Sequence, residues 1–352
     1  MKVLVVGGTG FVGSHTARAL AAAGHEVAVL TRPTSPRRAL TGLEVEWVAG
    51  DLRAPESLLA ACRGRDAVVH TAGVLSLWRR EAEALYRTNV LGTRHLLEAC
   101  LAAGVGRVVW DGSVGIYAGT RSPVPVDERG ADTTDRFHSF HVTSMCLAEA
   151  EVWKAAARGL DVVCLHPGLC VGEDDRSWHS SWAIAGLAFA RLPFAPPGGL
   201  NLVDVLDVAR AHVLALERAP RGGNYLIGGE NLTNRALVDL LREVLDLRAP
   251  ALPISRATMR GFGQAGEWLA RLRGADRGLA VTLNAAMGEA MSLYWFVDDA
   301  RARRELGHGP GPVRPALERQ VRWLLAQGHL PQSGFGLRDF VERFFQPGPS
   351  AG

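Results

Sequence analysis

The sequence lacks the features that would place the protein in a membrane or outside the cell. No apolar run reaches the ~18 residues that a membrane-spanning helix needs. Met1 and Lys2 lead directly into a strand pattern, without the apolar region and small-residue cleavage site of a secretory signal. The five cysteines are odd in number and show no CxxC spacing, so we expect reduced core thiols and a cytoplasmic protein.

The sequence also lacks an excess of one charge. Its 39 Lys and Arg residues nearly balance its 36 Asp and Glu residues, which leaves a formal net charge of +3. This balance speaks against a nucleic-acid-binding stripe and against a polybasic membrane anchor, so the expected partner is a small-molecule substrate. With 352 residues, 47% of them hydrophobic, the chain is long enough for one large domain with a satellite, or for two domains.

The first 170 residues alternate between apolar strand patterns and helical patterns, without internal repeats. Such alternation predicts an α/β fold with a doubly wound parallel sheet and helices on both faces. The expected strands lie at 3–6, 26–30, 45–48, 67–70, 107–110 and 161–166, and the expected helices at 11–23, 55–62, 82–103 and 142–158.

Beyond about residue 170 the pattern is less regular. We expect strands at 201–205 and 223–228, helices at 208–218, 233–245, 256–272, 298–306 and 312–327, and Asp207 as the cap of the first of these helices. Four aromatic residues, Trp178, Trp182, Phe189 and Phe194, fit either an apolar wall over a cleft or simple core packing. The predicted organisation is a cofactor-binding domain at 1–170 that also receives strands from 201–230, a smaller α/β substrate-binding part at 171–345, and a disordered tail at 346–352.

A glycine-rich stretch, VLVVGGTGFVG, occupies residues 3–13 between the first strand and the first helix. Gly7 permits a tight turn, Gly10 allows backbone to approach a pyrophosphate, and Gly13 lets the helix lie close to the sheet. This order of strand, glycine turn and helix predicts a dinucleotide site of Rossmann type.

The residues after the second and third strands indicate which dinucleotide is bound. An acidic residue after the second strand would hold the ribose 2′-hydroxyl of NAD, whereas this chain has Arg32, which favours the 2′-phosphate of NADP over NAD. Asp51 follows the third strand and is placed beside the adenine. Thr71 to Gly73 are small residues after the fourth strand and are expected to pass close to the cofactor.

Motifs spread over almost the whole chain resemble one family, the extended short-chain dehydrogenase/reductases of the NAD-dependent epimerase/dehydratase group, and most of all its hopanoid-associated sugar epimerase and dihydroflavonol-reductase-like branch. They are GGTGFVG (7–13), GDL (50–52), HTAG (70–73), NVLGT (89–93), SVGIY (113–117), HPG (166–168) and NYLIGGENLT (224–233). The resemblance implies a Rossmann-type fold, cofactor contacts that include Phe11, Val12, Leu52, Ala72, Asn89, Pro167 and Gly168, and a homodimer built through helices 82–103 and 142–158.

The resemblance breaks at the catalytic residues. The family uses a Ser, followed by Tyr and Lys in a YxxxK pattern, where Lys lowers the pKa of the Tyr proton donor. Ser113 fills the Ser position, but His141 stands where Tyr is expected and Met145 where Lys is expected. Gly112 and His166 depart from the family pattern as well. Tyr117 is interpreted as packing or as lining the substrate side.

His141 has two open interpretations. Imidazole exchanges protons near neutral pH without help from a lysine, so His141 and Ser113 are the candidate catalytic residues; the alternative is a fold that has lost catalysis. Asp111 and His138 could join them in one pocket, whereas the histidine spacing indicates no metal site.

Three functions are therefore open. The first is an NADP-binding oxidoreductase or epimerase acting on a small carbonyl or hydroxyl compound, sugar-like or a secondary metabolite. The second is a non-redox cyclase, lyase or isomerase on the same scaffold. The third is a non-catalytic protein that senses NADP(H).

Overall fold

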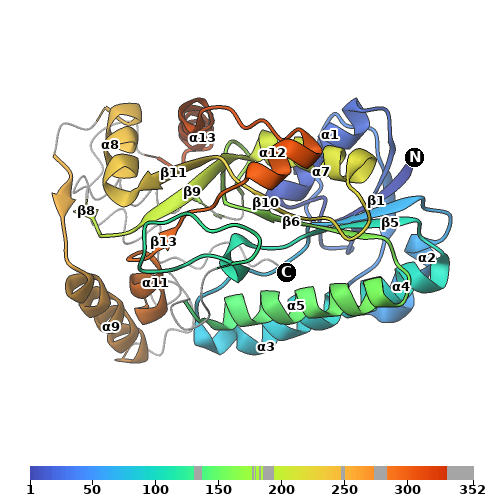
Figure 1. Cartoon of the computed structure of the whole chain (residues 1–352), viewed down its shortest axis with the longest axis horizontal. Helices are drawn as coiled ribbons and strands as arrows, with labels where there is room; N and C mark the ends of the chain where they lie inside the picture. Colours follow the sequence, from blue (N-terminus) through green and yellow to red (C-terminus); the bar gives the residue numbers. More distant parts are fainter. Residues whose placement is uncertain are drawn as a thin grey trace.

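A seven-stranded parallel sheet forms the centre of the computed structural model, which describes residues 1–130, 137–176, 178, 180–181, 184, 194–246, 250–272 and 284–330. The strand order is β10-β6-β5-β4-β1-β2-β3 (Figure 1). The strands are β1 (Lys2–Val6), β2 (Glu26–Thr31), β3 (Glu46–Ala49), β4 (Ala67–His70), β5 (Arg107–Asp111), β6 (Val162–Pro167) and β10 (Asn224–Ile227). All neighbouring pairs run parallel, which confirms the predicted doubly wound α/β sheet.

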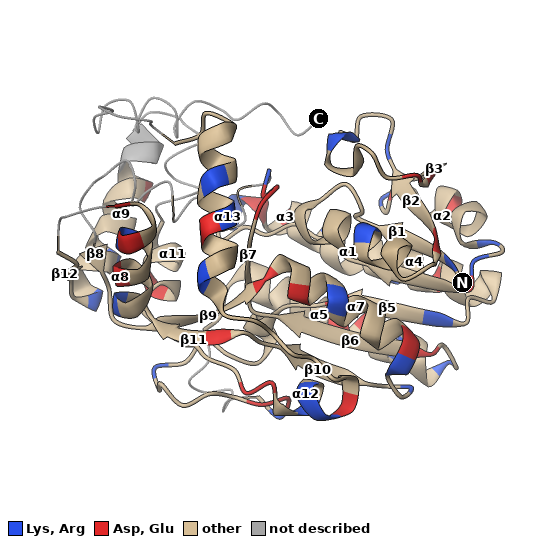
Figure 2. Ribbon diagram, turned by 90° about the horizontal axis from the view of Figure 1, so that it is seen from above, with Lys and Arg blue, Asp and Glu red and all other residues tan. Residues whose placement is uncertain are grey.

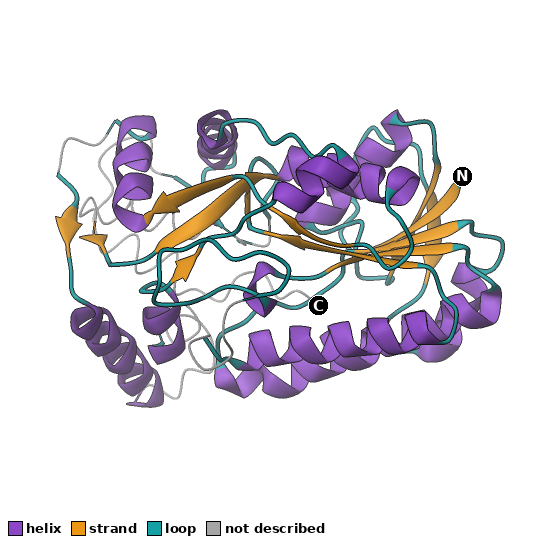
Figure 3. Cartoon of the chain, viewed as in Figure 1, coloured by secondary structure: helices purple, strands orange, loops and turns teal. Residues whose placement is uncertain are grey.

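Helices cover both faces of this sheet (Figure 3). One face carries α1 (Phe11–Ala22), α7 (Val205–Arg218) and α12 (Ala300–Leu306), and the other carries α2 (Pro55–Cys62), α4 (Gly92–Ala103) and α5 (Phe140–Ala157). The alternation of strand side chains explains both cores: Val3 and Val5 pack toward α1 and α7, whereas Leu4 and Val6 pack toward α2 and α4. The helix expected at 82–103 consists of α3 (Ala82–Leu85), a π-helical stretch (Tyr86–Leu91) and α4.

A second sheet lies beyond the carboxyl ends of the first. Its central strand β9 (Gly199–Asp204) pairs with β7 (Leu169–Val171), β11 (Glu230–Thr233) and β13 (Tyr294–Trp295). Helices α8 (Asn234–Val244) and α13 (Val313–Ala326) pack against this sheet around a third apolar core. The remaining elements are the short pair β8 (Phe194–Ala195) and β12 (Leu252–Pro253), with α9 (Arg256–Leu272) and α11 (Ala285–Ala290).

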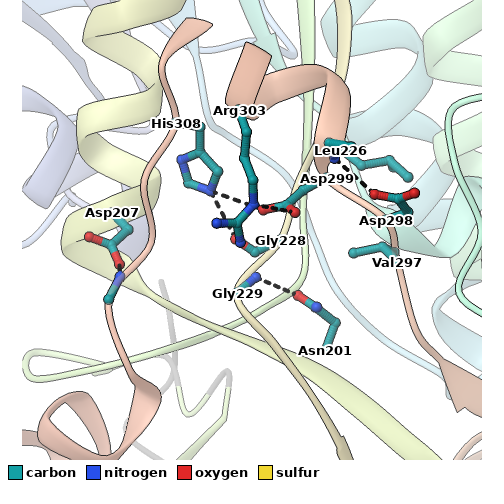
Figure 4. Close-up of polar contacts among 12 residues, drawn as sticks. Asn201, Asp207, Leu226, Gly228, Gly229, Val297, Asp298, Asp299, Arg303 and His308 are labelled. Carbon is teal, nitrogen blue, oxygen red and sulfur yellow. Dashed lines mark hydrogen bonds and ion pairs between the residues drawn. The ribbon is translucent and has the colours of Figure 1, made fainter.

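The residue that caps α7 differs from the prediction. Asp204 is the N-cap, and its carboxylate accepts a hydrogen bond from the Leu206 backbone N–H at 3.0 Å. Asp207, the predicted cap, lies inside the first turn and is buried, where it accepts a hydrogen bond from the Gly311 N–H at 2.9 Å (Figure 4). The strand β9 ends at Asp204 and passes into the helix without a connecting segment, so the helix begins three residues earlier than predicted.

The segment that follows β13 returns across the end of β10. His308 donates from Nε2 to the Gly228 carbonyl at 2.8 Å, and Arg303 donates from Nε to Asp299 Oδ1 at 2.8 Å (Figure 4). Burial lowers the pKa of His308, which is consistent with a neutral ring that donates to a carbonyl. These contacts fasten the late part of the chain to the large sheet.

Charges of both signs are interspersed along helices α7, α8, α12 and α13 (Figure 2), in keeping with the small net charge. Within the part of the chain that the structure describes, no helix is long and apolar enough to cross a membrane. All five cysteines are free thiols, four of them buried.

Candidate functional site

The glycine stretch folds as a tight turn between β1 and α1. Gly7 has a φ of +91°, which favours glycine, and a Cβ there would lie 2.6 Å from the Ala72 nitrogen. A Cβ on Gly13 would lie 2.2 Å from the Gly7 carbonyl oxygen, so glycine is needed where the helix approaches the turn. Gly10 is the N-cap of α1 and has no side-chain cap, which leaves the first N–H groups of the helix for a ligand. These features fit the pyrophosphate of a dinucleotide.

The turn opens into a cavity of about 760 Å³ at the carboxyl end of the large sheet. Most of the predicted cofactor residues line this cavity: Gly10, Phe11, Val12, Gly13, Thr71, Ala72, Gly73, Asn89, Pro167 and Gly168. They come from the ends of β1, β4 and β6 and from the helices that follow. Segments that are distant in the sequence thus meet at one edge of the sheet, as parallel topology requires.

Four predicted cofactor residues lie outside this lining: Gly7, Arg32, Asp51 and Leu52. Gly7 lies within the turn itself. Leu52 is buried, and a Cβ added to Gly92 would lie close to the Leu52 side chain. Asp51 and Arg32 follow the ends of β3 and β2 and influence one another electrostatically. Burial opposes ionisation of Asp51, but hydrogen bonds from Arg53 and the charges of Arg53 and Arg32 lower its pKa.

Ser113 stands in the cavity wall, two residues beyond Asp111 at the end of β5. Its hydroxyl oxygen accepts a hydrogen bond from the Gly115 N–H at 3.1 Å, which fixes the side chain and leaves the hydroxyl proton for a ligand oxygen. A Cβ on Gly115 would lie close to Ser113 Oγ, Val142 and Trp295, so this hydroxyl is beside an apolar wall.

His141 and Met145 line the same cavity from the first two turns of α5. Ser139 caps this helix by accepting a hydrogen bond from the Val142 N–H at 3.1 Å. The Ser144 hydroxyl donates to the His141 carbonyl at 2.7 Å and accepts from the Asn89 amide at 3.0 Å. Asn89 also bonds both backbone groups of Val74, so its side chain ties the helix that carries His141 to the loop after β4.

A cluster of buried polar side chains packs against the segment Asp111–Ser113. His166 Nε2 lies 2.7 Å from the Asn224 side-chain oxygen, and the Asn224 amide donates to the Tyr117 hydroxyl at 2.8 Å. Burial lowers the pKa of His166 to about 4, so its ring is neutral. A Cβ on Gly112 would lie 2.4 Å from His166 Nδ1. The two departures from the family pattern, Gly112 and His166, therefore fit one another.

Tyr117 is not among the residues that line the cavity. Its hydroxyl donates to Glu149 Oε1 at 2.8 Å, and burial together with the Glu149 charge raises its pKa. Of the two alternatives given for Tyr117, the structure supports packing rather than lining of the substrate side.

The end of the cavity beyond Ser113 and His141 is mostly apolar, and Ser180, Asn201 and Asn234 are the polar exceptions. It is lined by Leu77, Phe137, Val142, Phe194, Pro196, Leu237, Val238, Leu241, Ile254, Met259, Phe262, Met287, Ala290, Met291, Trp295 and Leu317. Among the described residues that line the whole cavity, none is Lys or Arg, and the charged or titrating side chains are Asp111, His141 and the Cys170 thiol. Away from the glycine turn, such a lining favours a substrate without a phosphate or other anionic group.

The structure does not bring every predicted residue to the cavity. His138 is exposed and outside the lining, and Trp178 packs against His329 with ring centroids 5.1 Å apart. Of the four expected wall aromatics only Phe194 lines the cavity, while Trp182 and Phe189, like the tail at 346–352, lie outside the described residues. The wall is instead formed by Phe137, Phe262 and Trp295, which carry no motif that would have singled them out. In the described residues, no group of His, Cys, Asp and Glu has the arrangement of a metal site.

Comparison with known proteins gives matches along nearly the whole chain. A model of the NAD dependent epimerase/dehydratase family matches residues 3–228. A putative dihydroflavonol 4-reductase from Synechocystis sp. is 31% identical over 93% of this chain and 95% of its own. Sterol demethylase protein B from Methylococcus capsulatus is 32% identical over 93% of this chain and 99% of its own. The structure of Thermus thermophilus UDP-glucose 4-epimerase with NAD has 25% identity and a TM-score of 0.69, covering 92% of this chain and 99% of that one.

Proposed function

The chain belongs to the NAD-dependent epimerase/dehydratase family, and from that premise we propose that it is an NADP-linked oxidoreductase for the hydroxyl or carbonyl group of an apolar compound. The observation that carries this proposal is the division of one cavity into a glycine-lined end and an apolar end, with Ser113 and His141 between them. When bound, the nicotinamide supplies hydride transfer. The protein's own residues hold the substrate and manage the proton.

Ser113 and His141 are the proposed catalytic residues. The Ser113 hydroxyl, held by the Gly115 N–H, donates a hydrogen bond to the reacting oxygen. An imidazole nitrogen of His141 exchanges a proton with that oxygen, because imidazole carries out this exchange near neutral pH without a lysine partner. Met145 has no donor, so it contributes apolar surface only. Asn89 and Ser144 keep the His141 turn in place.

The substrate class follows from the lining. A nucleotide sugar carries a second diphosphate besides that of the cofactor, and the described lining residues include no Lys or Arg to pair with it. The names of two relatives refer to a dihydroflavonol and a sterol, ring compounds without a nucleotide. We therefore favour a ring or chain alcohol, or the matching ketone, over a nucleotide sugar.

NADP is proposed as the cofactor because of Arg32 at the end of β2, with Arg37 nearby and held over the Trp47 ring at 4.6 Å.

A homodimer through α4 and α5 is also proposed, since Phe140 and Leu147 on α5 are exposed at 55% and 44%. Sedimentation at micromolar concentration tests the dimer, and a monomer there would contradict it.

Turnover of a substrate panel tests the function. Sterol alcohols, dihydroflavonols and long-chain ketones would each be offered with NADP or NADPH while nicotinamide absorbance is followed, and UDP-glucose would be offered with the products separated by chromatography, because epimerisation leaves no net change in absorbance. We expect turnover of an apolar member and none of UDP-glucose. His141→Ala is expected to lower kcat by about 10²- to 10⁴-fold, with His138→Ala, outside the cavity, as the matched control. Equal turnover in wild type and His141→Ala would remove His141 from the mechanism.

A further inference from the structure

Two buried side chains face one another behind the cavity wall. Asp111 ends β5, and His212 lies in α7, on the sheet face opposite α5. His212 Nε2 and Asp111 Oδ1 are 3.5 Å apart, with side-chain exposures of 0% and 10%. Neither atom has a hydrogen-bond partner among the described residues, and the two do not hydrogen-bond each other. Two polar atoms buried together in this way require a physical explanation.

The other ring nitrogen of His212 defines the state of the pair. His212 Nδ1 lies 2.9 Å from the Val208 carbonyl oxygen, which can only accept, so Nδ1 carries a hydrogen. A neutral ring would then present the Nε2 lone pair to the lone pairs of an ionised Asp111. That arrangement is repulsive in a buried site, whereas a hydrogen on Nε2 as well gives the ring a positive charge that attracts the carboxylate. The geometry therefore favours a pair that holds one proton.

Only one member of the pair reaches the cavity. Asp111 lines the wall two residues before Ser113, whereas His212 does not line it. The other titratable groups near this wall are engaged or neutral. Asp175 accepts hydrogen bonds from Ser180 and Ser181, the Asp204 carboxylate pairs with Arg319, and burial raises the pKa of the Cys170 thiol. A proton leaves the pair most directly through Asp111 to a ligand in the cavity.

We propose that Asp111 and His212 together are a second proton donor of the active site, acting from the α7 side while His141 acts from the α5 side. This inference rests on the proposed function for its reaction. In ketone reduction, the carbonyl carbon takes a hydride from the reduced nicotinamide and forms a C–H bond. The π electron pair moves to oxygen, which takes one proton, either directly from His141 or, by the route proposed here, from the pair through the Asp111 carboxyl. The pair is left as carboxylate and neutral imidazole and regains its proton from water after product release.

Nitrogen NMR of histidine-labelled protein tests the pair without any turnover. The His212 signals are assigned by their loss in His212→Gln, and Asp111→Asn removes the partner charge with little change of shape. We expect the Nε2 resonance of wild type to be at the protonated position at neutral pH and to move to the unprotonated position in Asp111→Asn. Identical Nε2 resonances in both proteins across the neutral range would overturn the proposal, even if the protein turns over no substrate in the panel.

Turnover then separates a donor from a structural pair. Asp111→Asn and His212→Gln should each lower kcat for an apolar ketone by about 10- to 100-fold, with NADPH affinity changed less than threefold. The alkaline limb of the pH profile should change in both variants, because only the decline due to His141 would remain. His308→Gln is the matched control, because His308 is also buried beside a carboxylate, Asp299, but donates to the Gly228 carbonyl and lies outside the cavity lining (Figure 4). Unchanged kcat and pH profile in Asp111→Asn, with folding verified by thermal melting, would overturn the catalytic role.

Discussion

The two ends of the cavity are built in opposite ways. The cofactor end consists of backbone turns at strand ends, where glycines allow close approach and the N–H groups of α1 remain available. The apolar end consists of side chains from separate segments between Leu77 and Leu317. The first end can bind only what fits its fixed backbone, whereas the second end is defined by side-chain volume and can change with few substitutions. The difference explains how relatives with one fold carry names that refer to different substrates.

The largest effect is expected from a methyl group at the cofactor end. In Gly13→Ala the new Cβ would lie 2.2 Å from the Gly7 carbonyl oxygen and 2.6 Å from Thr71 Oγ1, so the turn must shift. NADPH affinity should fall by at least about 100-fold, or close to 3 kcal/mol, as measured by tryptophan fluorescence. Gly261→Ala, on an open position of α9, is the control and should leave affinity unchanged. Wild-type affinity in Gly13→Ala would contradict the assignment of the turn.

A charge at the apolar end should have a smaller and separable effect. Met287→Lys places an ammonium group among apolar residues, so the KM for an apolar ketone should rise by about 30-fold because the charge must be desolvated. NADPH affinity should stay within twofold. Met287→Leu, similar in volume, is the matched control and should behave like wild type. If both variants bound the ketone equally, this wall would not contact the substrate.

Low pH is expected to destabilise the folded protein through two buried histidines, His70 in β4 and His166 in β6. Burial lowers the pKa values of His70 and His166 to about 4, below the ordinary value of about 6.5 that applies to the unfolded chain. Between these values the unfolded chain binds more protons, so the stabilisation present above pH ~6.5 is lost progressively as pH falls toward 4. In this range each histidine contributes up to about 1.4 kcal/mol per pH unit to the slope of the free energy of unfolding against pH. Urea unfolding at several pH values measures the slope, which should be shallower in His70→Asn; an unchanged slope would show that His70 does not contribute.

The smallest effect is expected at the outer edge of the cofactor end. Arg32→Ser removes the guanidinium proposed to meet the 2′-phosphate, so NADPH affinity should fall by about fivefold, or ~1 kcal/mol, while NADH affinity stays the same. Arg53→Ser is a suitable comparison, because the Arg53 side chain is exposed and forms an ion pair with Asp51. Equal loss for both cofactors would argue against a preference for NADP.

The sequence was most informative where a site depends on neighbouring residues. The turn at Gly7, Gly10 and Gly13 is contiguous, so its spacing predicted the strand, the turn and the helix together, and the sheet followed from alternation. The apolar end could not be predicted in the same way, because Phe137, Phe262 and Trp295 meet only through tertiary packing and look like ordinary core residues. His212 gave no signal either, since its partner Asp111 is about 100 residues away in the sequence. The wrong cap at Asp207 arose because the strand passes into the helix at Asp204 without the short connection that the prediction placed there.

The pairing of β13 with β9 has a consequence for how the protein is made. The large sheet is complete once β10 has emerged, at Ile227, whereas β13 and α13 extend the chain to Ala326. At about 5–20 residues per second, synthesis of the intervening segment takes roughly 5–20 s. During this interval the nascent chain has its dinucleotide turn but exposes the apolar surface that β13, α11 and α13 later cover. A nucleotide bound at that stage would stabilise the incomplete protein against aggregation before the apolar end of the cavity has formed.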